Sequence, residues 1–207
     1  MNNNAQKDMD KLIESITFEG KLPTLLIHAC CAPCSSYVLE YLSEYFNIIV
    51  LYYNPNITNR DEYRYRLSEE ARLISELPHK HEIRLVEGDY NPGLFLESVK
   101  GLENEPEGGR RCEVCFELRL REAAVNCKKL GADFFLTTLT ISPLKNAQKI
   151  NEIGERVAAE YGVNYLPSDF KKKNGYKRSI ELSREYNLYR QNYCGCVFSK
   201  SNIDNTD

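Results

Sequence analysis

Short apolar runs alternate with longer amphipathic segments along the chain. The apolar runs predict buried strands, and they cover residues 24–29, 48–53, 82–86, 133–138 and 163–166. The segments between them have helical length and periodicity, and they cover residues 33–42, 61–77, 93–100, 112–130, 146–161 and 176–187. Strands that alternate with helices predict parallel βαβ units, and therefore an α/β fold with a parallel sheet and flanking helices.

The length and composition predict one domain. The chain has 207 residues, and its 42% of hydrophobic residues suffice for a core. We expect residues 1–22 to be a loosely helical lead-in and residues 23–207 to form a single α/β domain. No apolar run reaches the length of a membrane span. The polar opening lacks the apolar stretch of a signal peptide, so we expect a cytoplasmic protein.

Seven of the eight cysteines fall into three groups. The first group ends the first predicted strand, the second opens the helix over 112–130, and the third lies near the end of the chain: Cys30, Cys31 and Cys34; Cys112 and Cys115; Cys194 and Cys196. Thiolates gathered in this way bind soft metals or transfer electrons. Cys127 falls on the apolar stripe of the same helix, so it is predicted to be a core residue.

The first two groups are expected at the functional edge of the sheet. Ligands of parallel α/β sheets bind beyond the carboxyl ends of the strands, where Cys30 and Cys31 fall. Cys112 and Cys115 share one face in the first turn of a helix, where backbone N–H groups favour thiolate. Four such thiolates suit tetrahedral zinc or an iron–sulfur cube. A thioredoxin-like redox pair and ordinary core cysteines remain alternatives for Cys112 and Cys115.

The third group has different spacing. Cys194 and Cys196 flank one glycine, which permits the backbone bend that closes a small disulfide ring. Such a ring is strained, and strained disulfides are easily reduced. The spacing therefore favours a two-electron redox pair, with metal ligands or two unlinked thiols as alternatives.

Two further residues are candidates for a second metal. Cys34 is either an additional ligand or the first buried residue of a helix. Asp89 follows the third predicted strand and is either a ligand or acid, or an ordinary turn residue. His28 lies inside the first strand, where a hydrogen-bonded core histidine is the expected role.

Residues 170–178 form the most basic stretch of the chain. Its cations, with two aromatic residues interleaved, are Lys171, Lys172, Lys173, Lys177 and Arg178. Phosphate contact combined with base stacking uses this mixture, although such charge runs are more often solvated loops. Because the net charge is -3, contact with RNA has to come from a local patch of this kind.

Several longer strings resemble those of the QueH-type epoxyqueuosine reductases. The likeness extends from Leu25 to Ser199, and it is carried by residues 28–34, 87–90, 101–115, 137–143, 145–147, 169–179 and 189–196. The resemblance implies a reductase that acts on tRNA. It would convert the epoxide of epoxyqueuosine in the anticodon loop to the cyclopentene of queuosine, the last step of queuosine synthesis, without cobalamin.

The same resemblance implies the cofactor, the residue roles and the sheet type. In this family the double-cysteine and Cys-x-x-Cys motifs bind a [4Fe-4S] cluster, which carries over to Cys30, Cys31, Cys112 and Cys115. The Cys-x-Cys pair, here Cys194 and Cys196, resembles a redox-active disulfide. The fold resembles the adenine-nucleotide α-hydrolase type of Rossmann sheet.

The expected reaction has a defined requirement for electrons and protons, and two other functions are alternatives. Removal of an epoxide oxygen takes two electrons and two protons, and an additional iron with an open position would hold the oxygen as a Lewis acid. One rival is a tRNA sulfur transferase on the same kind of sheet, although no glycine-rich phosphate loop follows the first strand. The other is a zinc-stabilised RNA-binding module. The sequence does not reveal the electron donor or the oligomeric state.

Overall fold

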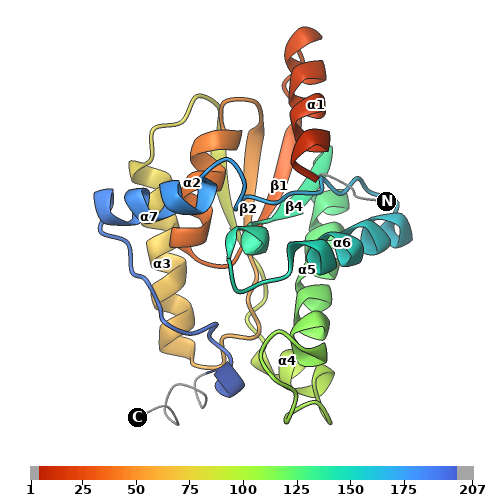
Figure 1. Cartoon of the computed structure of the whole chain (residues 1–207), viewed down its shortest axis with the longest axis vertical. Helices are drawn as coiled ribbons and strands as arrows, with labels where there is room; N and C mark the ends of the chain where they lie inside the picture. Colours follow the sequence, from red (N-terminus) through yellow and green to blue (C-terminus); the bar gives the residue numbers. More distant parts are fainter. Residues whose placement is uncertain (1–4, 200–207) are drawn as a thin grey trace.

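A parallel sheet forms the centre of the molecule (Figure 1). The computed structural model of the chain describes residues 5–199. Within that range the sheet has four strands in the order β3-β2-β1-β4, and all three pairings are parallel. The strands are β1 (Thr24–Ala29), β2 (Asn47–Tyr52), β3 (Ile83–Glu87) and β4 (Phe134–Thr137). The predicted α/β fold with a parallel sheet is confirmed.

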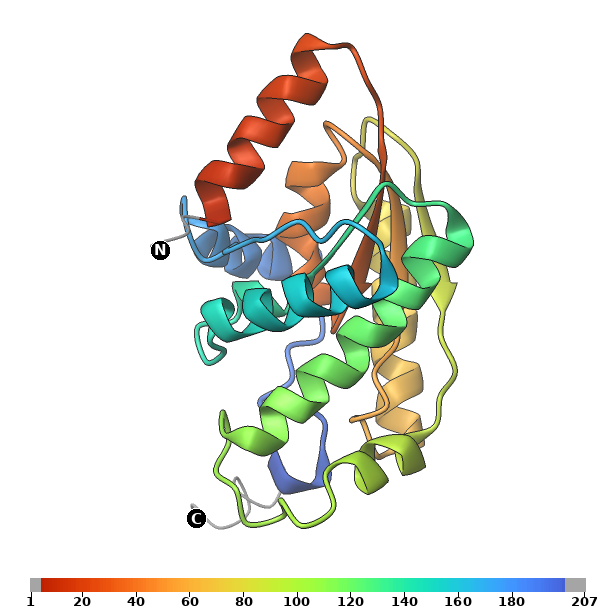
Figure 2. The same cartoon turned by 90° about the vertical axis from the view of Figure 1, so that its right-hand side faces the viewer.

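Helices cover both faces of this sheet. Helices α2 and α3 lie on one face, with α7 packed against α2, and α5 and α6 lie on the other (Figures 1 and 2). The bounds are α1 (Ala5–Phe18), α2 (Ala32–Leu42), α3 (Arg60–Glu76), α4 (Pro92–Ser98), α5 (Arg110–Leu130), α6 (Ala147–Tyr161) and α7 (Gly175–Glu185). The region predicted as a loose lead-in is thus largely one regular helix. No helix among residues 5–199 is long and apolar enough to cross a membrane.

Successive residues of the central strands enter two separate cores. Ile27 and Val50 pack towards α2 and α3, whereas Leu26 and Leu51 pack towards α5 and α6. Both faces of the sheet are therefore buried, which explains why its strands are continuous apolar runs rather than alternating ones. The buried sheet fixes the carboxyl ends of β1, β2 and β4, from which the site loops leave.

The predicted fifth strand, residues 163–166, does not form a strand. It contributes one isolated parallel bridge between Tyr165 and Phe135, held by hydrogen bonds from Phe135 N–H to Asn164 and from Leu166 N–H to Phe135. Pro167 follows directly and has no N–H to donate, so the pairing ends there.

The strand predicted over residues 133–138 is also shorter than expected. It ends at Thr137, and a 3₁₀ helix, η1 (Thr138–Ile141), begins there. This early turn carries Thr138 back towards β1, where its hydroxyl meets the first cysteine group.

Candidate active site

The first cysteine group lies in a sharp turn between β1 and α2. Cys31 is the N-cap residue of α2 and has an extended backbone. Pro33 occupies the first turn, where backbone N–H groups have no acceptor within the helix, so its lack of an N–H costs no hydrogen bond. The turn brings the Cys30 and Cys31 sulfurs to 3.8 Å from each other. With Cys34, all three sulfurs lie within 4.8 Å of one another, a grouping suited to a metal ion. The predicted turn is confirmed. Cys112 and Cys115 lie outside this group of sulfurs.

One thiolate is favoured within this group. Hydrogen bonds from Cys31 and Cys34 hold the pKa of the Cys30 thiol well below its usual value, and the Thr138 hydroxyl donates to the same sulfur at 3.4 Å. The same hydrogen bond to Cys30 raises the pKa of Cys31 to about 12, and the pKa of Cys34 is raised as well. Cys30 is therefore the residue already prepared to ligate, since metals bind the thiolate form.

His28 is hydrogen-bonded to the ends of the two strands next to β1, beneath the turn that carries Cys30 and Cys31. It is fully buried, its Nε2–H donates to the Tyr53 carbonyl at 3.0 Å, and its Nδ1 lies 2.9 Å from the Thr137 hydroxyl. Burial, together with the positive charge of Arg119, lowers the pKa of His28 to about 4. The predicted role of a hydrogen-bonded core histidine is confirmed.

The second cysteine group opens α5. Gly109 is the N-cap, so Cys112 and Cys115 lie one turn apart near the positive end of the helix dipole. The N–H of Gly108 donates to the Cys112 sulfur at 3.2 Å. Burial raises the pKa of Cys115 to about 12. The helix begins two residues earlier than predicted, at Arg110, and both cysteines remain on the face that lines a cavity.

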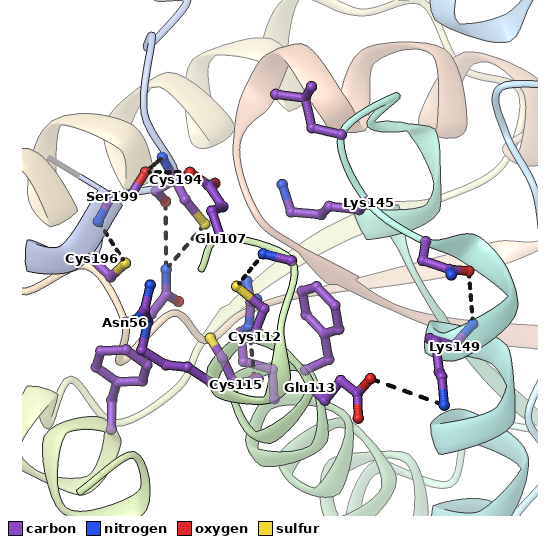
Figure 3. A pocket seen from close by; sticks show the side chains of 17 residues that line it. Asn56, Glu107, Cys112, Glu113, Cys115, Lys145, Lys149, Cys194, Cys196 and Ser199 are labelled. Carbon is purple, nitrogen blue, oxygen red and sulfur yellow. Dashed lines mark hydrogen bonds and ion pairs between the residues drawn. The ribbon is translucent and has the colours of Figure 1, made fainter. Parts of the chain in front are cut away.

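The third group faces the second across this cavity. Cys194 and Cys196 line it together with Cys112 and Cys115, and Figure 3 shows the four sulfur atoms gathered on one side. The N–H of Ser199 donates to the Cys196 sulfur at 3.3 Å. The structure holds all eight cysteines as free thiols. Cys127 is fully buried on α5, as predicted.

A second cavity adjoins the first and contains Cys30, Cys31 and Cys34 in its wall. The two cavities share lining residues from four parts of the chain, namely Glu107, Arg119, Leu144, Lys145, Cys194 and Ser199. Sulfurs from early, middle and late parts of the sequence therefore line two adjoining cavities.

Two cations stand between the sulfur groups. Arg119 is buried, donates from Nε to the Cys115 carbonyl at 3.2 Å, and has no hydrogen-bond partner for Nη2 among the described residues. The Lys145 amine makes no ion pair within residues 5–199. Burial opposes its charge, but the Cys194, Cys30 and Cys34 sulfurs outweigh burial and raise its pKa. The region is arranged to hold negative charge.

The predicted nucleic-acid segment is partly neutralised by ion pairs. Lys171 pairs with Asp169 at 3.0 Å, Lys173 with Asp10 at 2.7 Å and Arg178 with Glu40 at 2.6 Å. Lys172 and Lys177 are exposed and make no ion pair with any described residue.

Tyr176, from the same segment, lines the cavity of the first cysteine group. Asp89 is exposed and belongs to no group of metal-ligating side chains among residues 5–199.

Several site residues were not anticipated from the sequence. Arg66 and Glu70 on α3, Asn56 after β2, and Arg119 are all buried polar residues near the cysteines. A signal existed on α3, because Arg66 and Glu70 share the helical spacing of the buried Tyr63 and Leu73. A charged residue on an otherwise buried face is a sign of a functional or structural polar site.

The fold and this region define an α/β enzyme with a thiol-lined, cation-bearing centre at the carboxyl edge of its sheet. A family model described as epoxyqueuosine reductase QueH matches residues 25–202. The chain therefore belongs to the QueH family of epoxyqueuosine reductases and is an oxidoreductase of tRNA queuosine synthesis. This finding confirms the predicted reductase over the sulfur transferase and the zinc-stabilised RNA-binding module.

Curated relatives carry the same name. The epoxyqueuosine reductase QueH of Streptococcus pyogenes serotype M1 is 45% identical, covering 96% of this chain and 80% of its own. The protein from Staphylococcus epidermidis is 44% identical over 97% and 87% of the two chains. That of Thermotoga maritima is 36% identical over 85% and 90%.

A solved structure of NMN synthetase from Francisella tularensis aligns with 97% of this chain and 90% of its own. The sequence identity is 11% and the TM-score is 0.35. The α/β class rests on the strand order and parallel pairing, and the resemblance to adenine-nucleotide α-hydrolases stays a prediction.

Proposed function

We propose that the chain reduces epoxyqueuosine in tRNA at a [4Fe-4S] cluster held by Cys30, Cys31, Cys112 and Cys115. The observation that carries this proposal is the meeting of two cysteine-lined cavities along a shared wall. Cys30 and Cys31 come from the end of β1, and the other two come from the first turns of α5. Four thiolates from two such junctions are the ligand set of this cluster type.

The charges in the cavity wall fit an anionic iron–sulfur group. The Nη2 of Arg119 is a buried donor without a partner, which costs free energy unless something accepts its hydrogen bond. Lys145 adds a second uncompensated cation on the same wall. A thiolate-bound cluster would supply the negatively charged partner that Arg119 and Lys145 otherwise lack.

The cluster, when bound, supplies electrons one at a time, and the chain's own residues supply the surroundings. The Thr138 hydroxyl and the Gly108 N–H donate to cysteine sulfurs, and such hydrogen bonds tune the reduction potential. Phe95 and Phe116 line the cavity of the second group and help exclude water. His28 stays neutral at pH 7, so it holds the turn rather than donating protons.

Cys194 and Cys196 are proposed as the redox pair. Conversion of two thiols to a disulfide releases two electrons and two protons. Removal of the epoxide oxygen as water consumes the same two electrons and two protons. Cys194 lines both cavities, so it stands next to both cysteine groups. The disulfide would then be reduced again by a donor that the proposal leaves open.

An additional iron is proposed with Cys34 as a ligand. Its sulfur lies within 4.8 Å of those of Cys30 and Cys31, close enough to share a metal with them. The exposed position of Asp89, outside this group, gives it no comparable support.

For the tRNA, the basic segment over residues 170–178 is proposed as the contact surface. Lys172 and Lys177 are its exposed cations without ion pairs, whereas Lys171, Lys173 and Arg178 already have carboxylate partners.

The cluster is tested by anaerobic purification and measurement of iron, acid-labile sulfide and zinc. We expect iron and sulfide in the wild type, and loss of both, with loss of turnover, in Cys112→Ala. The matched control is Cys127→Ala, which removes a buried thiol of the same helix away from the cavities and should retain the cluster. Full activity of Cys112→Ala, or zinc as the sole metal of the active protein, would contradict the proposal.

A further inference from the structure

The segment that carries Cys194 and Cys196 is fastened along α3 (Figure 1). Arg72 donates to the Tyr186 carbonyl at 3.0 Å and to that of Asn187 at 3.4 Å. Glu69 accepts the N–H of Tyr189 at 2.9 Å. Charged side chains of α3 therefore provide hydrogen-bond partners for backbone groups of this segment, which lies outside the regular helices and strands.

Arg66 is the most deeply buried of the α3 side chains that bind this segment. Its side chain is 2% exposed, and Glu62 pairs with it at 2.7 Å. Its Nη1 donates to the Cys194 carbonyl at 3.2 Å, and its Nη2 donates to the Tyr193 carbonyl at 3.5 Å. The guanidinium also lies 5.1 Å from the centre of the Tyr193 ring.

The backbone on the other side of this contact is equally constrained. Gly195 has φ of 110°, a value that side chains rarely adopt, and a Cβ there would lie 2.8 Å from Ile57 and 3.3 Å from Arg66. The Gly195 carbonyl accepts the N–H of Thr58 at 3.3 Å. Asn56 Nδ2 lies 3.5 Å from the Cys194 carbonyl and 4.0 Å from its sulfur. The bend between the two cysteines thus has one well-defined shape.

We propose that Arg66 is the positioning residue of the Cys194–Cys196 pair. By holding the two carbonyls that precede Gly195, it keeps both sulfurs in the wall of the cavity that Cys112 and Cys115 line. Arg66 touches no reacting atom in this role, because it acts through the backbone. The effect of Arg66 on disulfide formation rests on the proposed redox function of the pair. Its effect on the position of the two sulfurs does not.

The redox consequence concerns the equilibrium between dithiol and disulfide. With glutathione disulfide as oxidant, Cys194 and Cys196 lose two electrons and two protons and form one S–S bond, and two molecules of glutathione are released. A fixed bend sets the distance between the two sulfurs and therefore the equilibrium constant of this exchange. Release of the bend changes that constant.

The test compares Arg66→Met and Arg66→Lys with a control, Arg72→Met. Arg72 fastens the same segment, but at residues 186 and 187, away from the cysteines. After equilibration with glutathione, the alkylated peptide that contains both cysteines is quantified by mass spectrometry. We expect at least a tenfold change in the equilibrium constant for Arg66→Met, partial rescue by Arg66→Lys, and less than a twofold change for Arg72→Met. An unchanged constant in Arg66→Met, or an equal change in Arg72→Met, would overturn the proposal.

A second readout separates this proposal from the redox function. If the wild type forms no disulfide at any glutathione ratio, the redox pair fails, and the alkylation rate of Cys196 under reducing conditions decides the role of Arg66. Cys196 is 9% exposed, so alkylation should be slow in the wild type and in Arg72→Met. It should be at least tenfold faster in Arg66→Met. Equal rates in all three proteins would refute the positioning role.

Should Arg66→Met fail to fold, Gly195→Ala replaces it, because its Cβ collides with Ile57 and disturbs the same bend without removing a charge from α3. The same tenfold acceleration at Cys196 is expected. Wild-type alkylation in a folded Gly195→Ala protein would count against the proposal.

Discussion

Glu70 is a carboxyl group enclosed in the interior of the molecule. It is fully buried on α3, and neither of its oxygens has a hydrogen-bond partner among the described residues. Burial raises the pKa of Glu70 to about 8. The residue is therefore mostly protonated at pH 7, beside the helix that carries the first cysteine group.

This carboxyl group makes the stability of the protein depend on pH. Because the folded pKa lies above the unfolded value of 4.5, its contribution is fully present below about pH 4.5 and is lost as the pH rises to about 8. The full shift corresponds to a loss on the order of 5 kcal/mol. Urea unfolding of the wild type and of Glu70→Gln at several pH values checks this. The variant should lose less stability over that range, and parallel curves would contradict the assignment.

The burial of some residues could be predicted from the sequence, and that of others could not. Cys127 and His28 were predicted correctly because apolar neighbours at helical or strand spacing fix their burial. Arg66, Glu70 and Arg119 were not, because a charged residue is buried only where distant groups or a ligand offset its desolvation. Those groups come from other parts of the chain.

At the scale of elements, α5 and α6 are joined by a surface ion-pair network. Glu117 on α5 accepts Arg156 of α6 at 2.8 Å and Arg121 of its own helix at 2.8 Å, and Arg121 also pairs with Glu160. Hydrogen bonds from Arg156, opposed in part by burial, hold the pKa of Glu117 at about 2. The network tightens the packing of two helices that both cover one face of the sheet.

Replacement of Glu117 by Gln should lower the free energy of unfolding by about 1 kcal/mol at pH 7, since the network is partly exposed and screened by water. Because the folded pKa is depressed, this stabilisation is present above about pH 4.5 and disappears as the pH falls towards 2. Thermal unfolding at low and high salt measures the effect. A difference between the two proteins that persists at high salt would argue against an ionic origin.

The elements themselves were largely predictable, and the exceptions have a physical cause. Long amphipathic helices and fully buried strands leave strong periodic signals. Residues 163–166 carry the same apolar signal as a strand, but whether such a run joins a sheet depends on available partners and on Pro167. One bridge to Phe135 is all that forms.

Across the whole molecule, the two cavities meet at Lys145. This residue lines both, and its loop, which also carries the exposed Leu144, lies between η1 and α6. The sequence grouped seven cysteines, but it did not indicate that they line two adjoining cavities. That arrangement depends on the path of residues 186–194 along α3.

Loss of the Lys145 charge should impair catalysis without unfolding the protein. We expect kcat to fall at least tenfold in Lys145→Met, because a fixed charge in a site shielded from water stabilises developing negative charge. Lys149→Met is the matched control, since Lys149 lines the same cavity but lies exposed near Glu113 and Glu152. Steady-state kinetics at matched metal content per protein measure both, and equal kcat values would exclude a role for the Lys145 charge.

Contact with tRNA should depend on the unpaired cations of the basic segment. The double variant Lys172→Gln/Lys177→Gln should bind tRNA at least fivefold more weakly and show a shallower dependence of affinity on salt. The control Lys171→Gln should change affinity less, because Lys171 is paired with Asp169. Binding titrations at two salt concentrations distinguish these outcomes. Unaltered affinity of the double variant would place the tRNA surface elsewhere.

The cavity that both Cys30 and Cys194 line has a consequence for biosynthesis. Cys30 is synthesised well before Cys194, yet both line one cavity. A nascent polypeptide therefore exposes Cys30, Cys31 and Cys34 until the segment that carries Cys194 has been made. The complete set of sulfurs in this cavity wall accordingly comes together only after that segment has been synthesised, so the earlier thiols have to stay reduced until then.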